Sequence, residues 1–174
     1  MTVKFHILHR STNQLKFIAE IDCDNNASDQ IKRGLAVVWA ARNDVDMTRA
    51  DFSFADLRGA DLQEANMSGA DLRNANLSNA NLSGADLECA SLGSANMAGA
   101  NLTSSGLWRA NLEGANLSGA TMVGAFLDDA NLFFANLTGA NLSHAKLSRA
   151  NIVGAIMAGA DLSGVDLTSA WSFR

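Results

Sequence analysis

The sequence has few of the residues on which catalytic and metal sites depend. Only three of its 174 residues are histidines and only two are cysteines. None of His6, His9 and His144 has a carboxylate or cysteine partner at a fixed spacing, and no phosphate-binding, zinc or nucleophile motif is present. We therefore expect a protein that is not an enzyme, with no catalytic residues, no cofactor and no metal ion.

The sequence also lacks the signals of a disulfide, of a membrane-spanning segment and of a signal peptide. Cys23 and Cys89 are far apart and fit no metal or disulfide spacing, which favours two free thiols in a reducing compartment. The longest apolar run, Leu35–Ala41, is too short to cross a bilayer. Residues 1–20 alternate apolar and polar side chains, unlike a signal peptide. The expectation is a cytoplasmic protein with no membrane association.

Charge is sparse and slightly negative. Charged residues make up 18% of the chain, and the net charge is −5. Residues 1–45 carry +1, residues 46–90 carry −5 and residues 91–174 carry −1. A mild acidic bias argues against direct binding to nucleic acid or to an anionic membrane surface.

What the sequence does contain is a five-residue period that runs from Val45 to Trp171 without insertion or deletion. Every fifth position from Met47 to Leu167 is Leu, Met, Phe or Ile, in all 25 units. The residue two positions earlier is Ala in nearly every unit. A fixed short period predicts a stacked solenoid in which each unit packs only on its neighbours.

The alternation within each unit indicates which side chains point inward. In extended backbone, the Ala and the Leu-type residue share one face, and the Asp or Asn between them faces outward. The two remaining residues are of types that suit a corner. A coil with four such sides would take four units, and its bore would be filled by Ala and Leu, leaving no interior ligand cavity.

The unit Ala-Asn-Leu-Ser-Gly at residues 115–119 resembles the consensus unit of the pentapeptide-repeat proteins. The resemblance implies an all-β solenoid, a right-handed quadrilateral β-helix of about six coils, roughly 30 Å long at the spacing of neighbouring strands. Outward amides four units apart would then stack into ladders that stabilise the coils. These are Asn76, Asn96, Asn116 and Asn136.

Residues 1–44 follow other periods and are expected to form a separate unit before the β-helix of residues 45–174. Residues 3–7 and 15–20 alternate around a polar break, which predicts a β-hairpin. Residues 29–43 show helical spacing, with Ser28 as the expected N-cap. This arrangement is similar to a leader that precedes such arrays in bacterial and phage proteins.

An open-ended solenoid exposes apolar side chains and unpaired backbone groups, so its ends need caps. We predict that the helix covers the mouth of the first coil, with Trp39 as its largest plug and with Phe52 and Phe54 beside it. An alternative interpretation makes the hairpin and helix a binding module, and both roles can hold together. The expected cap residues are Ile31, Leu35, Val38 and Trp39.

Departures from the repeat are the best guide to a contact surface. Phe126 occupies an outward position normally held by Asp or Asn, with Gly106 below it and Lys146 above. Contiguous exposed apolar residues often mark contacts. We predict a homodimer joined through the C-terminal coils, end to end or side by side. The alternative is local packing of these side chains. The candidates are Trp108, Phe126, Phe133, Phe134, Val153, Ile156, Trp171 and Phe173.

Two further departures are interpreted as structural. The outward column Arg109, Asp129 and Arg149 alternates in charge and predicts an exposed ladder of small energetic weight. Ser105 replaces an inward Ala, and its hydroxyl is expected to bond to nearby backbone.

The favoured function is a non-catalytic structural or interaction module that presents a rigid rod to an unidentified protein partner. The resemblance implies an alternative, a DNA-mimicking binder of DNA gyrase or a related topoisomerase that confers quinolone or toxin resistance. Interrupting arginines, and the lack of a protruding loop and of a C-terminal helix, weigh against it. The candidate acidic surface is Asp46, Asp51, Asp56, Asp61, Glu64, Asp71, Asp86 and Glu88.

Overall fold

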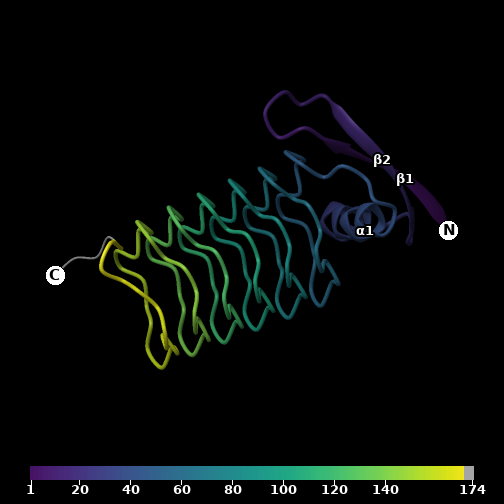
Figure 1. The fold of residues 1–174 in the computed structure, drawn as a ribbon. Coiled ribbons are helices and arrows are strands. Elements are labelled where there is room, and N and C mark those ends of the chain that lie inside the picture. The colour runs from purple at the N-terminus through teal and green to yellow at the C-terminus, as the bar shows by residue number, and fades with distance from the viewer. Residues whose placement is uncertain (171–174) are drawn as a thin grey trace.

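The computed structural model describes residues 1–170, and it places a hairpin and one helix at one end of a coiled rod (Figure 1). Strands β1 (Thr2–Leu8) and β2 (Leu15–Asp22) form a two-stranded antiparallel sheet. Helix α1 (Asp29–Arg42) follows, and the Ser28 hydroxyl accepts a hydrogen bond from the Ile31 amide at 3.4 Å. The expected hairpin, helix and N-cap are therefore all present.

The rest of the described chain coils with a regular period. Outward residues pair in parallel with their counterparts four units later, from Asp51 with Asp71 to Asn141 with Asp161. In a typical rung, the Asn76 amide donates to the Ala55 carbonyl at 2.9 Å, and the Asn76 carbonyl accepts from the Leu57 amide at 2.7 Å. Four five-residue units thus make one coil, which confirms the four-sided arrangement.

From residue 49 to residue 164, each corner is a tight turn with one residue in the left-handed region. The Ala75 amide closes such a turn on the Leu72 carbonyl at 3.1 Å, and Asn74 between them has a φ of 59°. A positive φ at this position is typical of type II turns and favours Gly or Asn. Phe54 and Phe134 occupy the same kind of position, with φ values of 60° and 55°. Large side chains at these corners therefore project from the rod at some cost in backbone strain.

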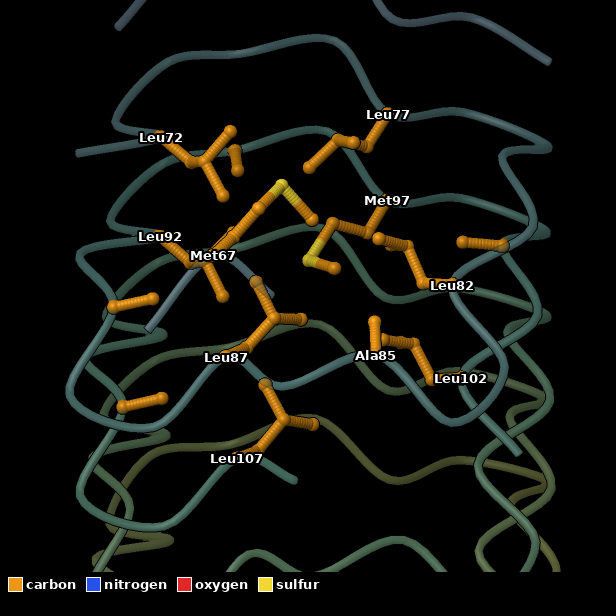
Figure 2. Packing of buried hydrophobic residues seen from close by; sticks show 14 of the residues in the cluster. Met67, Leu72, Leu77, Leu82, Ala85, Leu87, Leu92, Met97, Leu102 and Leu107 are labelled. Carbon is orange, nitrogen blue, oxygen red and sulfur yellow. The ribbon is translucent and has the colours of Figure 1, made fainter. Parts of the chain in front are cut away.

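The bore is filled by vertical columns of apolar side chains. Figure 2 shows Met67, Leu87 and Leu107 one above another, with a second column of Leu72 and Leu92 beside them. These side chains are fully buried. Ser105, the one inward hydroxyl of the array, is also fully buried and donates to the Leu102 carbonyl at 2.8 Å. The interior is a packed apolar core, as the repeat predicted.

Amide ladders run up the outside of the rod. Asn96 donates from its side chain to Asn76 at 3.3 Å, and Asn116 donates to Asn96 at 3.1 Å. Asn136 continues the column, donating to Asn116 at 3.4 Å. Each side chain also accepts from the backbone amide two residues on, as Asn116 does from Ser118. The expected Asn column is confirmed.

The N-terminal elements pair with two sides of the first coil. The Asp51 amide donates to the Leu8 carbonyl of β1 at 2.8 Å. On the next side, the Asp56 amide donates to the Gln30 carbonyl of α1 at 3.0 Å. The Phe52 ring, fully buried inside this coil, lies 6.4 Å from the Phe17 ring. Backbone groups that would be unpaired on these two sides are thus bonded to the hairpin and the helix.

Helix α1 turns a different face to the rod from the one expected. Its buried residues are small, and a Cβ on one of them, Gly34, would collide with the Asp56 carbonyl oxygen. Only small residues allow a helix to approach a neighbouring backbone this closely. Ile31 is 43% exposed, and Leu35, Val38 and Trp39 are only partly buried, so Trp39 is not the plug of the first coil. The buried residues of α1 are Gly34, Ala36, Val37 and Ala40.

Candidate contact surface

An aromatic stack forms on one side of the later coils. The Trp108 indole stacks on the Phe126 ring with a centroid distance of 4.8 Å and an interplanar angle of 29°. Lys146 places its ammonium nitrogen 5.1 Å from the Phe126 centroid, a distance typical of a cation–π contact. A Cβ at Gly106 would lie 3.1 Å from the indole. Glycine therefore provides the space in which Trp108 folds beside Phe126.

A second aromatic group lies at a neighbouring corner. The rings of Phe133 and Phe134 are 4.2 Å apart, and Phe134 is 61% exposed. The Phe134 ring covers Gly154, where a Cβ would lie only 2.5 Å from it. Val153 is partly buried, and its carbonyl accepts from the Phe134 amide at 3.1 Å. We call Phe133, Phe134 and Val153 the phenylalanine corner.

The two aromatic groups are separated by one side of the rod. That side carries the ladder in which Asn131 donates to Asn111 at 3.0 Å and Asn151 donates to Asn131 at 3.1 Å. Trp108 is 39% exposed, so stacking does not bury it fully. The clusters therefore pack locally and still present apolar surface.

Of the three remaining residues that were expected to form the contact surface, the structure describes one. Ile156 stands above Asn136 on the side beyond the phenylalanine corner and is 54% exposed. Trp171 and Phe173 lie outside the described residues. The C-terminal half thus combines the aromatic stack, the phenylalanine corner and Ile156 around three consecutive sides.

A charged groove lies beside Trp108. Arg149 forms a two-pronged ion pair with Asp129, with nitrogen–oxygen distances of 2.7 and 2.6 Å. The hydrogen bonds from this guanidinium lower the pKa of Asp129. Of the expected column of three charges, only the upper pair is directly bonded among the described residues. The groove is lined by Glu88, Trp108, Arg109, Asp128, Asp129, Ser148 and Arg149.

Half of the candidate acidic residues already have a cation partner. Lys16 of the hairpin lies 2.5 Å from Asp46, and Arg33 of the helix lies 3.2 Å from Asp51. The other two pairs join an acid to an arginine two residues later. Sequence reasoning treated those arginines as interruptions of an acidic surface. It did not predict that Lys16 and Arg33 of the N-terminal unit pair with Asp46 and Asp51, although the net charge of +1 on residues 1–45 was a signal for this. The pairs within one unit are Asp56–Arg58 and Asp71–Arg73.

These partners keep the carboxylates ionised. The hydrogen bond from the Lys16 ammonium lowers the pKa of Asp46 to about 2. The hydrogen bonds from Arg58 likewise lower the pKa of Asp56. Burial alone would raise the pKa of Asp71, but its hydrogen bonds from Arg73 outweigh burial, and the pKa falls. These four carboxylates are negatively charged, but each lies beside a positively charged side chain that offsets its charge.

The acidic residues are also spread around the rod. The four-unit period puts Asp46 and Asp86 on one side, Asp51 and Asp71 on the second, Asp56 on the third and Asp61 on the fourth. Glu64 and Glu88 occupy corners. The coil therefore does not gather the acidic candidates on one face.

Two observations bear on the environment of the chain. Cys23 is partly buried and Cys89 is exposed, and both are free thiols. Among residues 1–170, no helix is long and apolar enough to cross a membrane.

A family model described as pentapeptide repeats matches the chain in eight copies, over the segments 43–63, 50–88, 65–103, 95–132 and 130–168. Among curated proteins, no match is found.

Several solved structures are similar. Rfr23 from the cyanobacterium Cyanothece 51142, a pentapeptide repeat protein, is 32% identical over 54% of this chain, with a TM-score of 0.49. The match spans 60% of the Rfr23 chain. A pentapeptide repeat protein of the Arabidopsis thaliana thylakoid lumen is 33% identical, covering 62% of this chain and 70% of that one, with a TM-score of 0.47.

QnrB1, described as a plasmid-mediated fluoroquinolone resistance protein, is similar in a trypsin-treated form. It is 22% identical, covering 67% of this chain and 76% of that one, with a TM-score of 0.48.

Proposed function

Because the chain belongs to the pentapeptide-repeat family, whose fold is a right-handed quadrilateral β-helix, we propose that it is a non-catalytic interaction module. Its rigid rod presents the C-terminal coils to a protein partner. The observation that carries the proposal is the aromatic stack, in which Trp108 remains 39% exposed beside Phe126 and Lys146. Exposed tryptophan is costly in water and is enriched at the centres of protein contacts.

The partner we propose is a second copy of the chain. The phenylalanine corner and Ile156 extend the apolar surface of the stack, and together they offer the kind of patch that a homodimer covers. Within this proposal, both free thiols fit a reducing compartment, and we assign the protein to the cytoplasm.

The N-terminal unit, residues 1–44, has the role of a cap in this proposal, and the rod of residues 45–174 has about six coils. Support comes from the bonds that the Asp51 and Asp56 amides make to Leu8 and Gln30, because these groups would otherwise be open on the first coil. Because the first coil is covered in this way, two copies of the chain are expected to associate through the later coils and not through this end.

Light scattering and sedimentation of the wild-type chain test the dimer directly. A Trp108→Ser, Phe134→Gly double variant is expected to be monomeric, because it removes both exposed aromatic groups. Phe54→Gly is the matched control, since Phe54 is 54% exposed and has a φ of 60° at an early corner. A monomeric wild-type protein at high concentration, or a double variant that still dimerises, would contradict the proposal.

The second candidate is a DNA-mimicking binder of DNA gyrase or a related topoisomerase. Asp61, Glu64, Asp86 and Glu88 favour it, since they have no ion-pair partner among the described residues. A gyrase supercoiling assay with quinolone or toxin tests it. The expected signs are protection or inhibition by the wild-type chain that is lost on charge removal at Asp86 and Glu88. Absence of both effects would end this candidate.

A further inference from the structure

One side of the rod carries opposite charges at the two ends of the aromatic stack. Four outward positions follow one another up this side, each joined to the next by a parallel bridge: Asp86, Gly106, Phe126 and Lys146. At the spacing of neighbouring strands, the acid and the amine lie about 14 Å apart along the rod. Trp108 covers Gly106, so the two aromatic rings fill the middle of the column. We call these five residues the stack side.

Both charges of the stack side can pair with a second molecule. Neither Asp86 nor Lys146 forms an ion pair within residues 1–170. The Asp86 carboxylate accepts a hydrogen bond from the Glu88 amide at 2.9 Å through one oxygen, and its other oxygen accepts none from these residues. Lys146 is exposed, and its contact with the Phe126 ring leaves ammonium protons for a carboxylate.

The corners that border the stack side allow a close approach. On one border, the corner residues from Ser83–Gly84 to Val123–Gly124 are small or apolar and carry no charge. On the other border, the exposed Glu88 adds a second carboxylate at the level of Asp86. The side is therefore acidic at one end, aromatic in the middle and basic at the other end.

This order of groups favours one arrangement of two copies. Two rods packed side by side in the same direction would place Asp86 against Asp86 and Lys146 against Lys146, and like charges in contact are costly. A two-fold axis that lies between the rods, perpendicular to them and level with the stack, reverses one of them. Lys146 of each copy then meets Asp86 of the other, and Trp108 of each copy lies beside Phe126 of the other. A two-fold contact forms every such pair twice.

We propose that the chain forms an antiparallel, side-by-side homodimer through the stack side. The inference rests on the proposed function and specifies its contact. The aromatic rings supply the buried centre, and the two ion pairs between Lys146 and Asp86 set the direction and the register. The phenylalanine corner, which is one side away, lies at the margin of this contact.

Charge reversal with rescue tests the pairing. Asp86→Lys and Lys146→Glu each create two like-charge pairs in the dimer, and each variant alone is expected to raise the dimer Kd at least about tenfold in sedimentation velocity. An equimolar mixture of the two variants should recover the wild-type Kd, because every pair in the mixed dimer again joins opposite charges. The Asp86→Lys, Lys146→Glu double variant should recover it for the same reason.

The outcomes separate this contact from the dimer itself. A wild-type chain that is monomeric would contradict the proposed dimer and this contact together. A dimeric wild type that neither substitution weakens would keep the dimer and refute the stack side, as an end-to-end contact would do. Weakening without recovery in the mixture or in the double variant would also refute it. Circular dichroism of each variant checks that the fold is kept.

Cross-linking tests the register without reversing a charge. In a Cys23→Ser, Cys89→Ser background, Asp86→Cys and Lys146→Cys chains are mixed and treated with a short bis-maleimide. Covalent dimers are expected between the two different chains, because identical positions of the two copies stay about 14 Å apart along the rod. Asn76→Cys, on the opposite side, is the matched control for Asp86→Cys and should not cross-link to Lys146→Cys. Cross-links that form equally within each single variant, or equally with the control, would overturn the antiparallel register.

Discussion

The N-terminal unit and the β-helix hold together by different means. In the β-helix the main-chain bonds and the amide ladders recur one coil later, as in the column Asn76, Asn96 and Asn116, so that each coil depends only on its neighbours. In the N-terminal unit each contact occurs once. Arg10, for example, reaches from the hairpin loop to the Gly69 carbonyl. Periodic structure spreads stability over many equal contacts, whereas the N-terminal unit concentrates it in a few.

The largest effect is expected from a cavity in the middle of the rod. Leu102→Ala should lower the free energy of unfolding by about 2–5 kcal/mol, because the side chain is fully buried and its neighbours are fixed by the coils above and below. Leu162→Ala, at a partly exposed inward position, should cost less. Urea unfolding of both variants measures this, and equal losses would contradict the view that burial decides the cost.

The next largest effect is expected from a substitution that disturbs the packing of α1 on the first coil. Gly34→Ala should cost about 1–3 kcal/mol, because the added methyl group collides with the Asp56 carbonyl and α1 must shift. Hydrogen exchange should accelerate in α1 and the first coil while the later coils stay protected. Gly93→Ala is the control, since a Cβ there would lie 3.7 Å from the Glu113 carbonyl, an ordinary contact. Uniform loss of protection along the rod would show that the two regions unfold as one.

A ladder asparagine tests the repeated polar contacts. Asn116→Ala removes the bonds to Asn96 and Asn136 and the turn bond from Ser118, with an expected loss of about 1–2 kcal/mol in thermal or urea unfolding. Thr121→Ala should change little, because Thr121 makes no side-chain hydrogen bond within the described residues. Equal stability of the two variants would show that the ladder is incidental.

The smallest effect concerns pH. The pKa of Asp46 is about 2 in the folded chain and 3.8 in the unfolded chain, so its ion pair with Lys16 stabilises the fold above pH 3.8. This contribution is lost as the pH falls towards 2. Because the Asp46 side chain is 66% exposed, the change is a few tenths of a kcal/mol. Asp46→Asn and Lys16→Gln should both flatten acid unfolding curves slightly, and unchanged curves would contradict this.

Prediction from sequence succeeded where information was periodic and local. The inward Ala and Leu columns, the Asn ladder and the Ser28 N-cap each follow from a spacing that repeats or from a few adjacent residues. The stack of Trp108 on Phe126 was not predicted, although Gly106, directly below Phe126 and one coil earlier, was the available signal.

Prediction from sequence was weaker where a single contact between distant segments decides the arrangement. The rule that the largest apolar side chains are buried pointed to Ile31 and Trp39, but the close approach of α1 to the Asp56 carbonyl requires Gly34. Likewise, the acidic residues of the first units looked like one surface. The coil distributes them over its four sides, and Lys16 and Arg33 pair with two of them from the N-terminal unit.

The sequence by itself determined which side chains of each unit face inward, the packed bore and the two outward aromatic groups, because a strict five-residue period leaves each side chain one orientation. The four sides of the coil were what the resemblance to the pentapeptide-repeat proteins implied. Only the tertiary structure decided which face of α1 meets the rod and which acids pair with a cation. Those features depend on the distance between segments that are remote in the chain and meet only once, and no spacing in the sequence encodes that distance.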